Sequence, residues 1–139
     1  MRANLVQRLG LLDWSRYLLP HHFSRNPSSM HLWMGRRAER LSAERGSRIS
    51  IIAPRGNAKS TVWSLSYPLR CAIDGSEAYT WIVSDTADQA RQHLENIVLE
   101  LEWNERLHGV SVSQRNKSRL VLSNGCRIDA LGTGQRIRG

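Results

Sequence analysis

The sequence predicts an α/β fold in which a parallel sheet is flanked by helices. Apolar runs of strand length alternate with longer stretches of helical periodicity, as is typical of strand–helix–strand units. One apolar run, at 49–53, is followed directly by a glycine-containing loop and a helix-compatible stretch. Near the C-terminus, an Asn-Gly pair between two apolar runs predicts a β-hairpin. A chain of 139 residues is long enough to form one domain with a hydrophobic core.

The N-terminal third is expected to be helical. Within residues 3–19, leucines at near-helical spacing alternate with arginines and predict an amphipathic helix; the leucines are Leu5, Leu9, Leu12 and Leu19. The segment 20–27 has a proline at each end and interrupts this pattern. Ser28 or Ser29 offers an N-cap for a second helix that runs to about Glu44 and ends near Gly46. We therefore expect residues 1–46 to form a helical lead-in to a core formed by residues 47–139.

The expected core begins with a buried strand at 48–53, which a tight loop connects to a helix from Lys59 to about Ala72. Residues 74–76 then form a turn, and residues 78–84 form a second buried strand. In open parallel sheets, ligands bind at the carboxyl ends of the strands. The loop at 54–60 is therefore expected at such an end.

A long helix and the hairpin complete the expected core. Asp85 or Thr86 caps the helix, which runs to about Arg106. Its apolar face is expected to carry Ala90, Leu94, Ile97, Val98 and Leu101. The hairpin strands are expected at 119–122 and 126–131, with the turn at 123–125.

The loop has the residues of a phosphate-binding site, and its sequence from 53 to 61 is Ala-Pro-Arg-Gly-Asn-Ala-Lys-Ser-Thr. A loop between a strand and a helix that opens on Lys-Ser presents backbone N–H groups and the helix dipole to phosphate groups. Lys59 is expected to bind the terminal phosphates, and the Ser60 hydroxyl is expected to ligate Mg²⁺. Thr61 would donate to a neighbouring phosphate oxygen. We expect the cofactor contacts to come from Arg55, Gly56, Asn57, Ala58, Lys59, Ser60 and Thr61.

The loop departs from the common phosphate-loop pattern at two positions. Ala53 and Ala58 stand where glycine is usual, and Gly56 alone remains inside the loop. Glycine permits positive φ and close approach of the backbone, so Ala58 is expected to carry a conformational cost. The alternative interpretation is an ordinary strand-to-helix turn with a chance Lys-Ser-Thr sequence.

Arg55 has two possible roles. Its guanidinium can stabilise charge that develops on the γ-phosphate, as an arginine supplied by the same chain, which makes it a candidate catalytic residue with Lys59. Alternatively, it forms a salt bridge with a nearby acid and holds the loop. The sequence does not separate these two roles.

Charge is unevenly distributed along the chain, whose net charge is +8. Residues 1–70 contain 12 Lys/Arg and 3 Asp/Glu, whereas residues 71–139 contain 8 and 9. A basic half suggests a polyanionic partner such as DNA, although 18 of the 20 basic residues are arginines, which a GC-rich genome alone can produce. Only two lysines occur and one is Lys59, which indicates a specific demand for a compact ammonium group.

Other features carry weaker signals. Ser84 and Asp85 end an expected strand, where they line a nucleic-acid path or, more simply, cap a helix. The glycine-rich end of the chain offers Arg136 and Arg138 to DNA phosphates or to the nucleotide of a neighbouring subunit. Surface or packing roles are expected for the histidines, among them the adjacent pair His21 and His22, because no metal-ligand spacing accompanies them. Core packing, and not base stacking, is expected for the five tryptophans.

The remaining composition favours a cytosolic protein. Charged residues interrupt the N-terminal leucines, so no segment approaches the length of a membrane span, and the start lacks the apolar core of a signal peptide. Cys71 and Cys126 have no metal-ligand spacing and suit free thiols in a reducing compartment. A single disulfide between them is also compatible with the sequence.

Together, the order of segments resembles the N-terminal part of the ATPase domain of phage terminase large subunits, over about residues 18–139. The lead-in Leu-Pro-His-His-Phe at 19–23 and Ser-Met-His at 29–31 are similar to the approach to the loop in this family. The Arg-Gly-x-Ala-Lys-Ser form of the loop, with alanine before the lysine, occurs in some phage packaging motors. The sequence Gly-Gln-Arg-Ile-Arg-Gly at 134–139 is similar to the stretch ahead of the family's acidic strand.

The resemblance implies a P-loop NTPase fold of the RecA-like (ASCE) type, with ATP and Mg²⁺ as cofactors. It also implies that the complete protein drives double-stranded DNA into a procapsid in the bacterial cytoplasm, as a ring of subunits that works with a portal and a small terminase subunit. The chain stops at Gly139, before any strand that ends in paired acids. We therefore expect an incomplete ATPase core that does not hydrolyse ATP by itself. The alternatives are a helicase-like DNA translocase and a non-catalytic DNA-binding or adaptor module.

Overall fold

The computed structural model describes residues 2–134 and confirms the α/β class. The chain forms two compact units, Met1–Tyr67 and Pro68–Gly139. The first unit is helical in its described residues, and the second contains a four-stranded sheet. The boundary between these units, at Tyr67 and Pro68, lies within a helical stretch. The predicted division between residues 46 and 47, into a helical lead-in and a core, stays a prediction.

The first unit begins with two helices where one was predicted. α1 (Arg2–Gln7) and α2 (Leu11–Leu18) are separated at Gly10, whose φ of −60° and ψ of 159° are those of extended backbone. The Leu11 N–H donates to Glu39 Oε1 at 3.0 Å, so a carboxylate lies at the N-terminus of α2, where the helix dipole favours negative charge. A tertiary contact therefore stabilises this second helix start, and the predicted single helix over 3–19 is wrong at that point.

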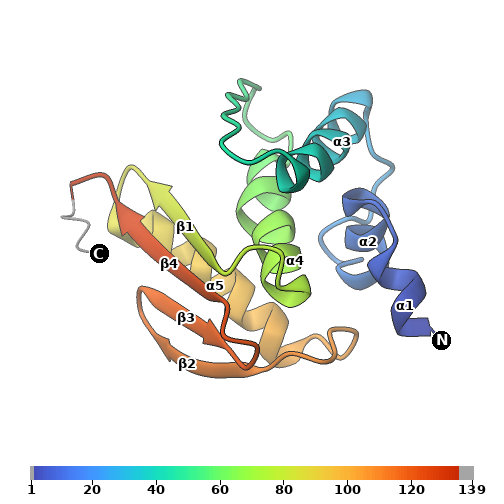
Figure 1. Cartoon of the computed structure of the whole chain (residues 1–139). Coiled ribbons are helices and arrows are strands. Elements are labelled where there is room, and N and C mark those ends of the chain that lie inside the picture. Colours follow the sequence, from blue (N-terminus) through green and yellow to red (C-terminus); the bar gives the residue numbers. More distant parts are fainter. Residues whose placement is uncertain (1, 135–139) are drawn as a thin grey trace. The chain divides into compact units, whose positions relative to one another are not determined.

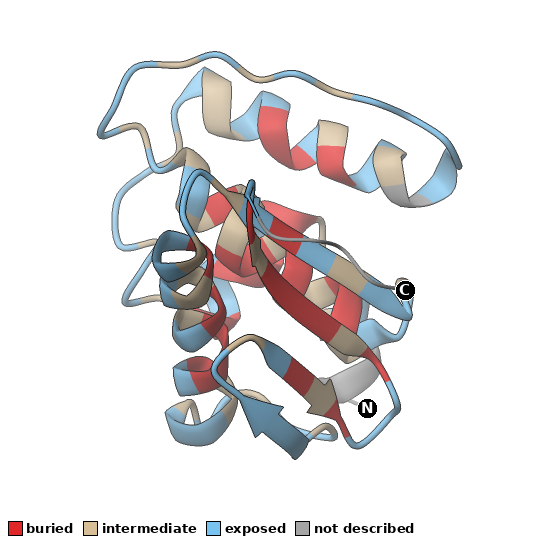
Figure 2. Ribbon diagram, turned by 90° about the vertical axis from the view of Figure 1, so that its left-hand side faces the viewer, coloured by how far each residue is buried: buried red, intermediate tan, exposed pale blue. Residues whose placement is uncertain are grey.

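The second predicted helix is confirmed as α3 (Ser29–Ala43), with Ser28 as its N-cap. Ser28 and His31 form a reciprocal capping pair, in which the Ser28 N–H donates to His31 Nδ1 at 3.1 Å. The buried residues of α3 lie on one side, and exposed residues lie between them along the helix (Figure 2).

A small hydrophobic core joins α2, α3 and the helix that follows the loop, η1 (Thr61–Ser66). Leu11, Met34, Ala38 and Val62 are buried in it. Partly buried side chains surround them, namely Phe23, Met30, Ile51, Trp63 and Tyr67. The buried hydroxyls of Ser15 and Ser66 hydrogen-bond to each other, which connects α2 to η1. η1 is a π-helix, in which the Tyr67 N–H donates to the carbonyl of Val62.

The strand predicted at 48–53 is absent from the described structure. Residues 47–54 form neither helix nor strand and pair with no strand, so the backbone groups of this segment gain no ladder hydrogen bonds. Ile51 packs against the helical core, whereas the side chain of Ile52 is 97% exposed. The loop therefore does not follow a strand of the sheet, and its predicted place at the carboxyl end of a strand is wrong.

The second unit contains α4 (Tyr67–Asp74), which begins at the unit boundary, and the sheet with its covering helix. The strands are β1 (Tyr79–Ser84), β2 (Val112–Asn116), β3 (Arg119–Leu122) and β4 (Arg127–Gly132), in the spatial order β1-β4-β3-β2. β1 pairs with β4 in parallel, and the other two pairs are antiparallel (Figure 1). The sheet is therefore mixed, not parallel as predicted, because the hairpin that the Asn-Gly turn forms places β3 antiparallel to β4.

One face of the sheet is covered by α5 (Ala87–Trp103), which contacts all four strands. Thr86 is its N-cap and accepts from the Gln89 N–H at 3.2 Å, which confirms one of the two predicted caps. The buried side of the helix carries Ala90, Leu94, Ile97 and Val98 as predicted, while Leu101 is half-buried. β1 was predicted to be buried, but it lies at the edge of the sheet and buries only Ile82.

The hairpin at 119–132 is confirmed, and its turn depends on Gly125, whose φ is +85°. Cys71 and Cys126 are both buried and free, so the disulfide alternative is not realised. In the described part of the chain, every helix is too short or too polar to cross a bilayer.

Gly132 permits close contact between the end of β4 and the start of α5. A Cβ atom at this position would lie 2.5 Å from the Ala87 nitrogen, and both neighbouring groups are backbone that cannot rotate away. Gly132→Ala is therefore expected to lower the free energy of unfolding by about 1–3 kcal/mol. Chemical denaturation measures the effect, and Gly134→Ala is the control because nothing lies within 4 Å of a Cβ there. Equal stability of both variants would contradict this packing.

Candidate phosphate-binding loop

The sign of φ alternates along the loop. Gly56 has a φ of +80° and Ala58 a φ of +51°, and no other residue between 53 and 60 has a positive φ. Residues that alternate between right- and left-handed conformations turn their successive N–H groups toward one side and form a concave anion-binding nest. Ala58 is the only described non-glycine residue with positive φ, so the conformational cost expected for alanine at this position is present.

The start of the helix leaves donors available beside this nest. The first helical hydrogen bond is donated by the Val62 N–H to the Ala58 carbonyl at 3.1 Å. The N–H groups of Lys59, Ser60 and Thr61 precede it, so the helix itself does not use them. Ser60, the residue before η1, makes no side-chain capping bond. Backbone donors at the start of a helix, together with the helix dipole, favour an anion.

The Lys59 side chain bonds back to the first residue of the loop. Its Nζ donates to the carbonyl of Ala53, the first residue of the loop, and the side chain is half-buried. Asn57 Nδ2 donates to the Pro54 carbonyl at 3.2 Å, which adds a second bond within the loop. The ammonium group is thus held over the loop and contacts no carboxylate within the described residues. A phosphate that enters would replace one carbonyl contact.

His31 contacts the loop from α3, a role that the sequence analysis missed. Its Nε2 lies 3.1 Å from the Asn57 carbonyl, while its Nδ1 accepts from the Ser28 N–H. These partners fit the neutral tautomer with the proton on Nε2, which donates to Asn57. The Ser-x-x-His spacing at the start of α3 was a signal for the capping pair, but nothing in the sequence indicated the contact with Asn57.

An open pocket lies beside the loop, between the unpaired segment 47–54 and η1. Its volume is about 360 Å³, and it is lined by Ile49, Ile51, Lys59, Ser60, Trp63 and Ser64. The structure thus brings two predicted site residues, Lys59 and Ser60, to the same pocket. Arg55 is exposed at the loop tip and forms no salt bridge with an acid of the described chain, so no such bond holds the loop there.

The other candidate residues of the sequence analysis are in the second unit or outside the described residues. Arg136 and Arg138 lie outside the described residues. Ser84 Oγ donates to Gln89 Oε1 at 2.9 Å, and the Asp85 carbonyl accepts from Thr133 Oγ1 at 3.1 Å, so both residues have local roles around the start of α5. Thr86 is the residue that caps that helix.

Asp129 is the most strongly engaged acid of the second unit. It lies on β4 and accepts from Arg119 Nε at 2.9 Å, from the Tyr79 hydroxyl at 2.8 Å and from Arg127. Burial by itself raises the pKa of this carboxyl, but the hydrogen bonds from Arg127, Arg119 and Tyr79 outweigh burial and hold its pKa well below the usual range. All of these partners lie in the sheet, so the network stabilises the sheet and leaves little capacity for a metal ion.

No family model, no curated protein and no solved structure matches this chain. What the loop does is therefore inferred from its residues and its geometry.

Ala58 provides a direct test of the loop conformation. Ala58→Gly is expected to raise the free energy of unfolding by about 0.5–1 kcal/mol, because glycine adopts the left-handed conformation without strain and this relief exceeds the extra entropy of the unfolded chain. Urea denaturation measures the change. Ala53→Gly is the matched control in the same loop and should give no gain, because Ala53 does not have a positive φ. Destabilisation by Ala58→Gly would argue against the alternating backbone.

The Asp129 network predicts a pH dependence of stability. Because the folded-state pKa lies below the unfolded value, the stability from this carboxylate is fully present above about pH 4 and is lost as the pH falls below it. Asp129→Asn is expected to cost about 1–3 kcal/mol at neutral pH, and its deficit should shrink as the pH falls from about 4 toward 2. Thermal melts across this range measure the deficit. Asp88→Asn, which changes a 92% exposed carboxylate, is the control and should follow the wild type.

Proposed function

We propose that residues 53–61 bind the phosphate groups of ATP together with Mg²⁺. The observation that carries this proposal is the pair of positive φ angles at Gly56 and Ala58, in the loop directly ahead of Lys59. Backbone of alternating handedness is the kind that forms an anion-binding nest. An ordinary strand-to-helix turn has no need for a left-handed alanine, since a less strained conformation would serve equally well. The conformational cost at Ala58 is understandable if the loop shape is required for an anion.

The charged and hydroxyl side chains of the loop have specific roles in this proposal. Lys59 exchanges its contact with the Ala53 carbonyl for the β- and γ-phosphates, and Ser60 ligates Mg²⁺. Thr61 and the first N–H groups of the helix bind the remaining phosphate oxygens. Arg55 is exposed and has no acidic partner in the described chain, so it is available to contact the γ-phosphate.

We further propose that this loop belongs to the ATPase domain of a viral DNA-packaging motor of the terminase type, with DNA as the polymer that it moves. The support is the form of the loop, the strand and long helix that follow it, and the separation of charge between the units. Residues 1–67 carry 11 Lys/Arg against 3 Asp/Glu, and residues 68–139 carry 9 of each. The net charge of the chain is therefore in the unit that contains the loop.

Hydrolysis of ATP also requires carboxylates that hold Mg²⁺ and orient water. Among the acids of the second unit, Asp129 is engaged by side chains of the sheet, and Asp88 pairs with Arg91 at the start of α5. We therefore expect the 139-residue chain to bind ATP without turning it over. The second candidate is a non-catalytic DNA-binding module, which the concentration of positive charge in the first unit also favours. A helicase-like translocase would use the same loop.

The two lysines of the chain allow a matched test of nucleotide binding. Lys59→Ala is expected to weaken binding of Mg-ATP at least tenfold, because a charge-assisted hydrogen bond to phosphate contributes about 1.5–3 kcal/mol. Lys117→Ala removes the other lysine, an exposed residue of the β2–β3 turn, and should bind like the wild type. Titration with a fluorescent ATP analogue measures both affinities, and circular dichroism verifies that the variants are folded.

Two results would contradict the assignment. One is wild-type affinity in a folded Lys59→Ala variant, and the other is an equal loss in both lysine variants, which would indicate attraction by net charge alone. Lys59→Arg separates charge from shape: it keeps the positive charge but replaces a compact ammonium with a planar fork, and should not restore full affinity.

A further inference from the structure

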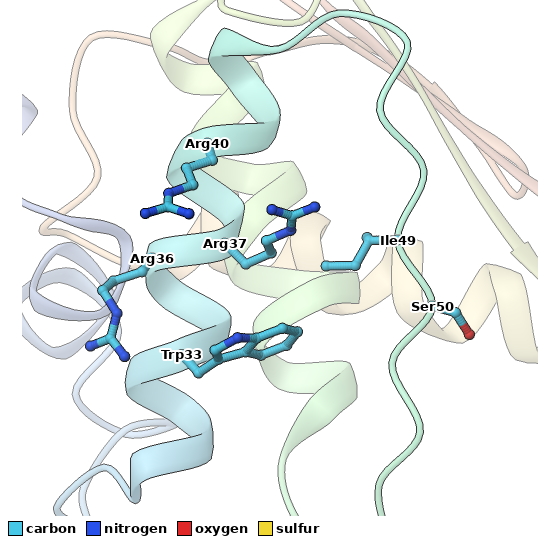
Figure 3. Close-up of a pocket in the computed structure, with 6 residues that line it drawn as sticks. All are labelled: Trp33, Arg36, Arg37, Arg40, Ile49 and Ser50. Atoms are coloured by element: carbon cyan, nitrogen blue, oxygen red, sulfur yellow. The ribbon is translucent and has the colours of Figure 1, made fainter.

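A second pocket of the first unit has a lining of a different kind. It lies along α3, has a volume of about 360 Å³, and is lined by Trp33, Arg36, Arg37, Arg40, Ile49 and Ser50 (Figure 3). Trp33 and Arg37 extend from α3 toward Ile49, and Arg36 and Arg40 extend from the opposite flank of the helix. Three guanidinium groups thus lie within about two turns of one helix.

These arginines are not neutralised by the described part of the protein, where none of the three forms an ion pair. The acid among them in the sequence, Glu39, accepts the Leu11 N–H and lies at the start of α2. Arg36 and Arg40 are four residues apart on the same helix, where like charges repel. An anion bound between the arginines would relieve this repulsion.

Trp33 presents part of its aromatic surface to solvent. Its side chain is 45% exposed, although the next residue, Met34, is fully buried in the core. The core packing predicted for the tryptophans holds for Trp14, which is buried, and for Trp63, which packs against the core. It does not hold for three exposed ones, Trp33, Trp81 and Trp103. The indole therefore contributes a large aromatic surface to a pocket whose other side chains are mainly cationic.

From these features we infer that the α3 pocket binds single-stranded nucleic acid. One base stacks on the indole of Trp33, Arg37 binds the adjoining phosphate, and Arg36 and Arg40 bind phosphates of neighbouring nucleotides on the strand. Guanidinium forks match phosphate oxygens, and stacking on an aromatic side chain is available to every base. In a duplex the base faces are already stacked, so Trp33 would gain nothing from double-stranded DNA.

A strand fits the pocket better than a free nucleotide does. The volume corresponds to a small ligand, but the arginines extend from two flanks of α3 (Figure 3), and a chain with several phosphates can contact both flanks. An acidic peptide would use the arginines but not the aromatic surface. The inference does not depend on the phosphate-binding loop, since it uses none of residues 53–61.

Fluorescence anisotropy with a labelled oligothymidylate tests the site in the 139-residue chain. Trp33→Ala is expected to weaken binding about tenfold or more, because stacking of one base contributes about 1–3 kcal/mol, and Trp33→Phe should recover part of that loss. Arg37→Ala should weaken binding and reduce the slope of log affinity against log salt by about 0.7, the value for one phosphate contact on a single strand.

Matched controls separate the pocket from general attraction. Trp103→Ala removes a tryptophan that is 77% exposed on α5, and Arg25→Ala removes an exposed arginine of the first unit outside the pocket. The first should bind like the wild type. The second should change affinity less than Arg37→Ala does. Quenching of tryptophan fluorescence by the oligonucleotide should disappear in Trp33→Ala and persist in Trp103→Ala.

Several outcomes would overturn the inference: unchanged oligonucleotide affinity in Trp33→Ala, a loss of duplex affinity in Trp33→Ala equal to its loss of oligonucleotide affinity, or competition by thymidine monophosphate or polyglutamate at a similar concentration. The phosphate-binding loop is tested separately. Lys59→Ala should keep oligonucleotide binding while it loses ATP binding, and Trp33→Ala should show the reverse. Loss of both activities in either variant would show that the two sites are not independent.

Discussion

The turn of the chain between the unpaired segment 47–54 and η1 contains two residues with positive φ, Gly56 and Ala58. For alanine this conformation is unfavourable by about 1–2 kcal/mol, so the neighbouring contacts must hold it. The bond from Lys59 to the Ala53 carbonyl and the contact of His31 with the Asn57 carbonyl provide this support. Burial of Val62 in the helical core fixes the start of η1 below the loop. The loop shape is therefore determined by its surroundings as much as by its own sequence.

The two proposed sites lie beside the same unpaired segment, residues 47–54. Ile49 lines both the pocket beside Lys59 and the pocket along α3, so a segment without strand pairing positions an apolar side chain between a phosphate site and a cationic aromatic surface. All of these groups belong to the first unit, which carries the net positive charge. In the second unit, Arg119 and Arg127 are paired with Asp129 on the sheet. These two arginines are therefore engaged by an acid of the same unit.

The segment 48–53 illustrates a limit of apolar patterns. A segment with three isoleucines, bounded by proline, has the composition of a buried strand, but a strand forms only where a neighbour completes its hydrogen bonds. Within the described residues no such neighbour is present, and Ile52 is exposed as a consequence. Trp33 shows the same limit for single residues, because its place on α3 is given by the sequence but its exposure depends on which elements pack beside it.

The sequence by itself determined the local features whose causes lie within a few residues: the start of α3 to within one residue, at Ser28 or Ser29, the cap of α5 at Asp85 or Thr86, the hairpin turn at Gly125 and the candidate loop from Ala53 to Thr61. The structure selected Ser28 and Thr86. Each depends on capping, turn geometry or spacing, which operate over short distances. The tertiary structure alone decided the break at Gly10, the mixed sheet, the contact of His31 with Asn57 and the cluster of arginines beside Trp33. These features depend on residues far apart in the chain, and neither periodicity nor composition specifies which distant partners meet.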